Sequence, residues 1–123
     1  MKRISINTDN AKILADLKDT PTAQALLDVL PFESNANIWG EEVYFSVPVT
    51  VDLEPDARQV VEPGTVCFWV EGNSVALPYG PTPISEGNEC RLVSQVNILG
   101  RILGNHNELS KINPGDSITI ELI

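Results

Sequence analysis

Residues 65–85 read TVCFWVEGNSVALPYGPTPIS and combine two apolar runs with a tight turn and a proline-rich loop. β-Branched and aromatic residues fill positions 66–70, and residues 74–77 are the expected partner strand across the Gly72-Asn73 turn. The prolines that follow, at positions 78, 81 and 83, fix φ and lack the amide donor that a strand needs. The sequence therefore predicts a β-hairpin that forms one wall of a small barrel, with a rigid loop at the rim of a cleft.

The chain has 123 residues, of which 42% are hydrophobic, and this fits a single domain over residues 1–123. Its net charge of -9 argues against nucleic acid or an anionic membrane as a partner, because phosphate binding depends on clusters of Lys and Arg. No apolar run approaches a membrane-spanning length, and residues 1–3 lead directly into an alternating pattern instead of the apolar core of a signal peptide. We expect a soluble, cytoplasmic protein.

The two cysteines, Cys67 and Cys90, permit one disulfide, but a reducing compartment favours two free thiols. Cys67 lies in an apolar run and is expected to be buried. Cys90 lies between Glu89 and Arg91 and is expected to be exposed. A redox pair is the alternative interpretation.

The N-terminal third predicts a hairpin followed by a helix. Residues 3–8 and 11–17 alternate around Asp9-Asn10, a dipeptide that suits a tight turn. Thr20 as N-cap and Pro21 at the first helical position start a helix that should end just before Pro31 and cover one end of the barrel with its leucines. Residues 32–38 look like a polar connection.

The remaining segments are mostly strand-like. Residues 39–49 predict a strand with Val43, Phe45 and Val47 on one face and Glu42, Tyr44 and Ser46 on the other. Residues 52–61 look like an acidic surface excursion. Residues 92–103 predict a strand in which Gly100 marks a bulge or a close backbone approach. A short helix over 105–112, capped by Asn105, and a final strand over 117–123 complete a count of about eight strands and two short helices.

Four segments together carry a resemblance to a known family. They read PFES at 31–34, NIWGEEVYFS at 37–46, GPTPIS at 80–85 and VNILGRI at 96–102. As a block they resemble a family of small stand-alone prokaryotic cyclophilin-like proteins, and the likeness covers essentially the whole chain. The resemblance implies a mainly β fold, a closed eight-stranded antiparallel cyclophilin-like β-barrel with two short capping helices. It implies no settled biochemical role.

The chain departs from the pattern of the cyclophilins that isomerise prolyl peptide bonds. Those enzymes present an arginine beside an aromatic floor, whereas the matching strand here reads WGEEVYF and carries carboxylates. A guanidinium donates to an amide and can polarise it, and a carboxylate cannot. Because Arg58 and Arg101 fall elsewhere, we assign no catalytic residue and do not expect an efficient prolyl isomerase.

The adjacent carboxylates Glu41 and Glu42 offer the sharpest candidate site. Neighbours on a strand point to opposite faces, so one can enter the cleft while the other is solvated; a solvent-facing edge strand is the alternative. The candidate ligand-binding residues are Glu42, Tyr44, Tyr79, Gly80, Thr82, Pro83 and Ser85. The hydroxyls of Thr82 and Ser85 could instead bond their own backbone. With His106 as the only histidine and no nucleotide-binding motif, no metal or cofactor is expected.

Three hypotheses about function follow. The favoured one is a non-enzymatic binding module whose cleft holds a peptide segment or a small polar ligand. The alternatives are a weak peptidyl-prolyl cis-trans isomerase and an accessory role in an amidase or oxoprolinase-type system, the last by analogy with cyclophilin-like domains found there. The sequence indicates no oligomeric state.

Overall fold

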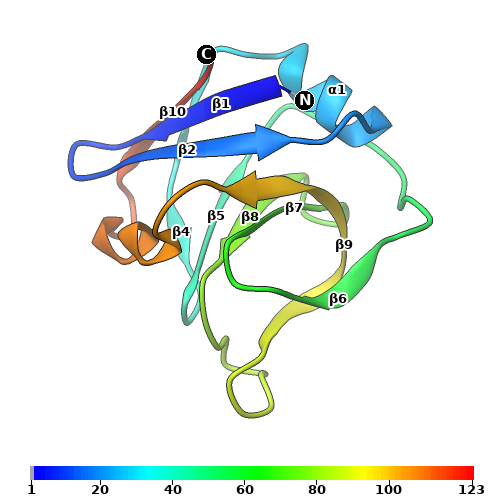
Figure 1. Ribbon diagram of the computed structural model, residues 1–123, viewed down its shortest axis with the longest axis vertical. Coiled ribbons are helices and arrows are strands. Elements are labelled where there is room, and N and C mark those ends of the chain that lie inside the picture. Colours follow the sequence, from blue (N-terminus) through cyan, green and yellow to red (C-terminus); the bar gives the residue numbers. More distant parts are fainter. Residues whose placement is uncertain (1) are drawn as a thin grey trace.

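The computed structural model describes residues 2–123, and these form one strongly curved antiparallel sheet (Figure 1). The strand order is β3-β10-β1-β2-β9-β7-β8-β5-β4, with β6 paired to β9 outside this path. The strands are β1 (Lys2–Asn7), β2 (Lys12–Leu17), β3 (Phe32–Asn35), β4 (Asn37–Ile38), β5 (Glu42–Ser46), β6 (Arg58–Val61), β7 (Thr65–Trp69), β8 (Ser74–Pro78), β9 (Cys90–Ile102) and β10 (Ser117–Leu122).

The two edges of this sheet meet, so that the barrel is nearly closed. Strands β3 and β4 stand at opposite ends of the strand order, yet only Ala36 separates them in the chain. The Ala36 amide donates to the Asp116 carbonyl at 2.8 Å, and the Ser34 hydroxyl donates to the Ser46 carbonyl at 2.7 Å. The predicted barrel is thus confirmed, with ten strands instead of eight. Residues 32–38, predicted as a connection, supply two of the strands.

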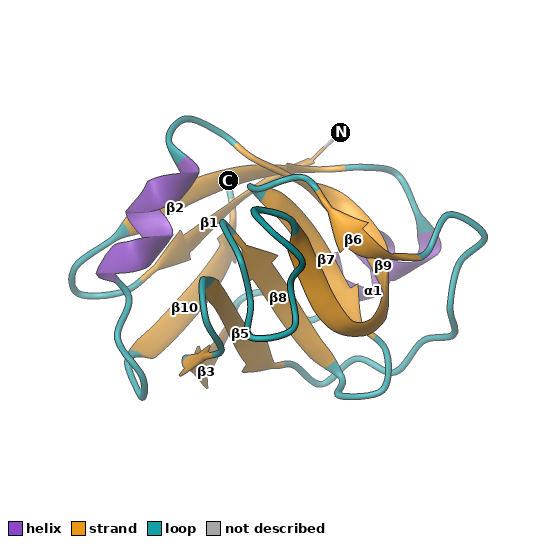
Figure 2. Cartoon of the chain, turned by 90° about the horizontal axis from the view of Figure 1, so that it is seen from below, coloured by secondary structure: helices purple, strands orange, loops and turns teal. Residues whose placement is uncertain are grey.

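Both predicted helices are present and cover the core from opposite sides of the molecule (Figure 2). Helix α1 (Pro21–Leu27) starts after Thr20, whose side chain accepts from the Ala23 amide, and it ends at Leu27, earlier than the predicted end just before Pro31. The 3₁₀ helix η1 (His106–Lys111) starts at Asn105, whose side chain accepts from the Asn107 amide. Ala23, Leu26 and Leu109 are at most 1% exposed and join the main core.

Strands β7 and β8 are buried on both faces, and β5 is buried on its inward face and half-buried at Tyr44 on its outward face. Their inward side chains, among them Phe45, Phe68 and Leu77, belong to the main core inside the barrel. Their outward side chains Cys67 and Ala76 join a second, smaller cluster with residues of β6 and β9, and we call this the outer cluster. It consists of Val61, Cys67, Ala76, Cys90, Leu92, Val96 and Ile98, with Tyr44 and Trp69 packed against it.

Strand β9 links the barrel to the outer cluster because it is long and bent. It pairs with β6 near its start, with β7 along its second half and with β2 at its end. The β7 register shifts between Val66 and Cys67, opposite Gly100 and Ile98. A Cβ atom at Gly100 would overlap the Asp16 carbonyl and Leu17 Cα, so the glycine permits close approach of β2. Both interpretations of Gly100, as a bulge and as a close approach, are confirmed.

The outer cluster corrects two predictions. The acidic excursion over residues 52–61 ends in strand β6, which pairs with β9. Cys90, expected to be exposed, is only 1% exposed because it lies opposite Val61 in that pairing and faces the outer cluster. Cys67 is buried as predicted, and both thiols are free. None of the helices within residues 2–123 has the length and apolarity needed to cross a membrane.

Candidate functional site

A pocket of about 120 Å³ lies on the outer face of the barrel, beside the outer cluster. Strands β5, β7 and β8 supply its floor, because Tyr44 lies opposite Ala76, and Ala76 lies opposite Cys67, in the two ladders. The start of β9 supplies the opposite wall. The lining residues are Trp39, Glu42, Tyr44, Trp69, Ala76, Leu92, Val93 and Val96. We call this the Glu42 pocket.

Glu42 is the only ionisable carboxyl among those lining residues, and it is held away from solvent. The residue is 5% exposed, and its Oε1 atom is buried without a hydrogen-bond partner in residues 2–123. Burial raises the pKa of Glu42 to about 7. An unpaired buried oxygen costs free energy, and a donor that entered the pocket would remove that cost.

Glu41 immediately precedes β5, and its side chain lies away from that of Glu42, as the alternation predicted. Its side chain is exposed and lies over Gly80, where it occupies the space that a Cβ atom would need. The two carboxylates therefore do not converge. An acid/base dyad formed by this pair is excluded by the strand geometry.

Aromatic rings form two walls of the Glu42 pocket. Tyr44 and Trp69 meet edge to face, with ring centroids 6.1 Å apart and planes at 88°. The Trp69 indole donates to the Ser94 hydroxyl at 2.9 Å, which fixes the ring against β9. Trp39 comes from the turn before β5, where its amide donates to the Glu42 carbonyl at 3.0 Å. This aromatic frame is well suited to an apolar group.

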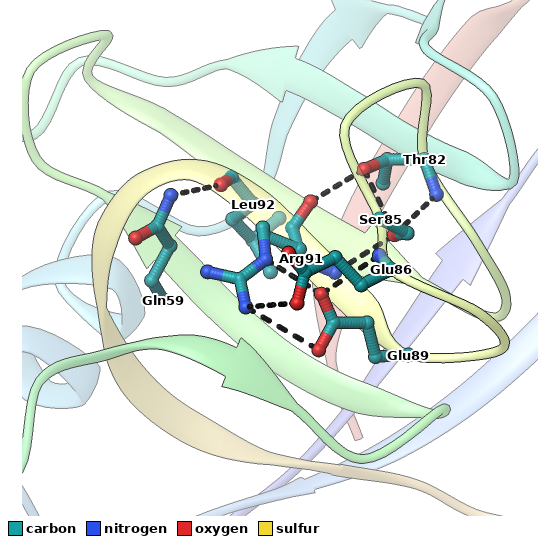
Figure 3. Close-up of polar contacts among 7 residues, drawn as sticks. All are labelled: Gln59, Thr82, Ser85, Glu86, Glu89, Arg91 and Leu92. Carbon is teal, nitrogen blue, oxygen red and sulfur yellow. Dashed lines mark hydrogen bonds and ion pairs between the residues drawn. The ribbon is translucent and has the colours of Figure 1, made fainter.

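The five candidate residues of the proline loop lie beside this pocket but do not line it. The Thr82 hydroxyl donates to the Arg91 carbonyl at 2.5 Å, and the Ser85 hydroxyl accepts from the Thr82 and Arg91 amides (Figure 3). The Tyr79 amide donates to the Glu41 carbonyl, and its ring packs on the main core. Pro83 lies close to Gly40, and Gly80 lies under Glu41.

The loop therefore holds the start of β9, and β9 in turn supplies a pocket wall. Figure 3 shows Arg91 paired with Glu89, Nε to Oε2 at 2.6 Å, and the next residue, Leu92, held by the Gln59 side chain. Hydrogen bonding to Arg91 lowers the pKa of Glu89. These contacts fix the position of Leu92 against the pocket.

Sequence reasoning placed Glu42 and Tyr44 on one face, and the structure brings them into one pocket. It did not assign Trp39 and Trp69 to the site, and it missed the wall that β9 supplies. The missed wall consists of Leu92, Val93 and Val96. For Trp69 a signal existed, because a run that is apolar at every position must bury both faces of its strand.

Cations and metal ligands are not gathered at this pocket. No guanidinium lines it in the described part of the chain. Across residues 2–123, no three His, Cys, Asp or Glu side chains come close enough together to hold a metal ion.

Comparisons with known proteins agree with this architecture. A family model described as cyclophilin-like matches residues 2–121. The solution structure of a hypothetical protein from Archaeoglobus fulgidus is similar, with a TM-score of 0.84 and 35% sequence identity. That similarity covers 99% of this chain and 95% of the archaeal one. A search of curated proteins found no significant match.

Proposed function

The chain belongs to the cyclophilin-like family, and from that membership together with the geometry of the Glu42 pocket we propose that it is a binding module rather than an efficient enzyme. Its ligand is a peptide segment or a small polar molecule. The observation that carries the proposal is the buried Oε1 of Glu42, which has no hydrogen-bond partner among residues 2–123, at an otherwise apolar and aromatic pocket. A group that brings a hydrogen-bond donor to this oxygen is stabilised there.

The volume and the charge of the pocket define the ligand class. A space of about 120 Å³ is somewhat smaller than the engineered cavity of about 150 Å³ that holds benzene, so one small ring or short aliphatic group fits. The carboxylate form of Glu42 accepts from an amine or amide N–H. The ligand is therefore a compact apolar group with an adjacent N–H, as in a small cyclic amine or a residue of a peptide.

The test compares pyrrolidine with tetrahydrofuran, two rings of the same size. Above the pKa of Glu42 its carboxyl is ionised and can only accept hydrogen bonds. Pyrrolidine then offers N–H donors and a positive charge, whereas tetrahydrofuran offers only an acceptor. In a ¹H–¹⁵N NMR titration at about pH 8, we expect pyrrolidine to shift the Tyr44, Ala76 and Val96 amides at lower concentration than tetrahydrofuran does. Acidification through pH 7 should remove this preference, because protonated Glu42 becomes a donor.

Two variants make the test specific. Glu42→Gln should weaken pyrrolidine binding about tenfold, since the amide loses the negative charge that attracts the ring nitrogen. The matched control is Glu41→Gln, which removes a neighbouring exposed carboxylate and should bind as the parent does. Equal binding of the two rings, or equal loss in both variants, would disprove the assignment.

Weak prolyl isomerisation is the second candidate, favoured by a pocket that accepts a five-membered ring. The pocket supplies a carboxyl but no guanidinium among its lining residues, so the means to polarise a prolyl amide is missing there. In a protease-coupled assay on a Pro-containing peptide we expect no acceleration over the uncatalysed rate. Acceleration that disappears in Tyr44→Ala would replace the binding proposal with this one.

A further inference from the structure

A second pocket, of about 180 Å³, lies on another side of the outer cluster. It shares no lining residue with the Glu42 pocket. Its walls are Lys18, Arg58, Val61, Glu62, Thr65, Ile98, Gly100 and Arg101. Three cations and one carboxylate thus meet at one place on a chain whose net charge is -9. We call this the cationic pocket.

The fold brings these cations together from three distant segments. Lys18 follows β2, and its amide donates to the Leu99 carbonyl at 2.7 Å. Arg58 begins β6 opposite Val96, and Arg101 lies near the end of β9 between its partners in β7 and β2. The backbone of each cation is therefore anchored, while each side chain is exposed to solvent.

The three cations lack acidic partners in the described part of the chain. Arg3 and Arg91 pair with Asp16 and Glu89, but none of the ion pairs within residues 2–123 includes Lys18, Arg58 or Arg101. The only polar side-chain contact recorded for the three within that range is from the Arg101 guanidinium to the Pro63 carbonyl, at 3.4 Å. Three like charges around one small space repel one another, and an anion between them relieves that repulsion.

We propose that the cationic pocket binds a small dianion, of the kind that a phosphate monoester or a dicarboxylate presents. Three cations and Glu62 leave a local net charge of +2, which a dianion neutralises. Guanidinium groups of Arg58 and Arg101 offer planar, paired donors that match the oxygens of phosphate and carboxylate. Thr65 contributes no free donor, because its hydroxyl already donates to the Glu62 carbonyl at 2.7 Å.

The test uses the intact protein with inorganic phosphate, succinate and chloride at matched ionic strength. We expect phosphate, succinate or both to raise the melting temperature and to shift the Thr65 and Gly100 amides saturably, and chloride to do neither. A response to phosphate alone identifies the phosphoryl class, and a response to succinate alone the dicarboxylate class. If neither exceeds chloride, the pocket is not a dianion site.

Variants that remove a positive or a negative charge should change the affinity for the dianion in opposite directions. Arg58→Gln and Arg101→Gln should each weaken dianion binding about tenfold, because each removes a charge-assisted hydrogen bond. Glu62→Gln removes a repelling carboxylate and should strengthen binding severalfold; the Thr65 contact is kept because it uses the Glu62 carbonyl. Lys12→Gln, an exposed cation outside the pocket, is the matched control and should bind as the parent does.

Two results with the charge variants would also overturn the proposal. If Lys12→Gln weakens binding as much as Arg58→Gln does, the anions act on the overall charge and no local site exists. If Glu62→Gln leaves the affinity unchanged while the arginine variants lower it, the dianion does not lie in this pocket. Neither result bears on the Glu42 pocket, whose test uses cationic and neutral rings.

Discussion

A single ionisable residue, Glu42, connects the stability of the protein to pH. Burial raises its pKa from 4.5 to about 7, so the folded chain holds this proton more tightly than the unfolded chain does. Its contribution to stability is therefore complete below about pH 4.5 and is lost as the pH rises to about 7.

The neutral variant Glu42→Gln should lack this dependence on pH. Between about pH 4 and pH 8 we expect the stability of the variant relative to the parent to rise by about 3 kcal/mol, measured by urea unfolding. Glu41→Gln is the control and should follow the parent at every pH. A constant difference between Glu42→Gln and the parent would show that Glu42 does not titrate in a buried state.

The two thiols make a second prediction at the scale of single residues. Burial raises the pKa of Cys90 to about 11 and that of Cys67 further still, so few thiolates form in the folded protein. We expect a thiol reagent to label neither cysteine rapidly in buffer and to label both in urea. Rapid labelling of either thiol in buffer would contradict the burial of the cysteine that is labelled.

The predicted burial was wrong for Cys90 and correct for Cys67, and the difference has a physical reason. Glu89 and Arg91 point away from the outer cluster and pair with each other, so charged neighbours gave no information about the face between them. Cys67 lies in a continuous apolar run, where either face is buried. Local polarity predicts burial only when neighbours share the same face.

At the scale of elements, one buried amide holds three segments together. Asn97 of β9 is fully buried, and its Nδ2 donates to the Thr22 hydroxyl of α1 and to the Asp52 carbonyl, each at 2.9 Å. Its Oδ1 accepts from the Glu54 amide at 2.7 Å. The Thr22 amide donates to Oε2 of the Glu54 carboxylate at 2.9 Å, which closes the network.

Removal of this amide should loosen the segment before β6. Asn97→Ala leaves several buried polar groups without partners, and we expect a loss of about 3 kcal/mol in unfolding free energy. Hydrogen exchange at the Glu54 amide should accelerate more than exchange in β1. The control is Gln95→Ala, an exposed residue of the same strand, which should change stability little. If both variants lost a similar unfolding free energy, the Asn97 network would not be a special source of stability.

The elements that the sequence predicted are those with local signals. Thr20, Asn105 and the Gly72-Asn73 turn act through neighbouring residues, and each stands where it was expected. Strands β3 and β4 are short and polar, and their partners β10 and β5 are determined by the closing barrel. Such strands form because they pair with distant strands of the sheet, and the local sequence pattern carries no information about that pairing.

At the scale of the whole molecule, the first and last strands are neighbours. Strand β10 pairs with β1, and the Ile123 amide donates to the Arg3 carbonyl at 2.9 Å. A short Gly/Ser linker can therefore join the two ends, with a new opening at the exposed Asp9-Asn10 turn.

This circular permutant should fold with a cooperative transition and retain the amide shifts of both pockets. The comparison is a permutant opened between Val66 and Cys67, inside a strand buried on both faces, which should not fold. If the first permutant failed to fold, the β1–β2 turn would have a role that the contacts do not reveal.

The sequence did not reveal either pocket in full. Alternation placed Glu42 and Tyr44 on one face, but the wall opposite them exists only because β9 bends and pairs with β6. Likewise Lys18, Arg58 and Arg101 form no cluster in the sequence and meet only in the folded chain. Both sites depend on contacts between residues that are far apart in the sequence.

The position of β1 between β2 and β10 has a consequence for biosynthesis. The chain emerges from the ribosome N-terminus first, so β1 can form its hairpin with β2 early but must wait for nearly the whole chain before its other edge is covered. An uncovered edge can pair with other chains. Nascent protein should therefore need a chaperone more than the finished protein does, and closure should be the slow, late event of folding.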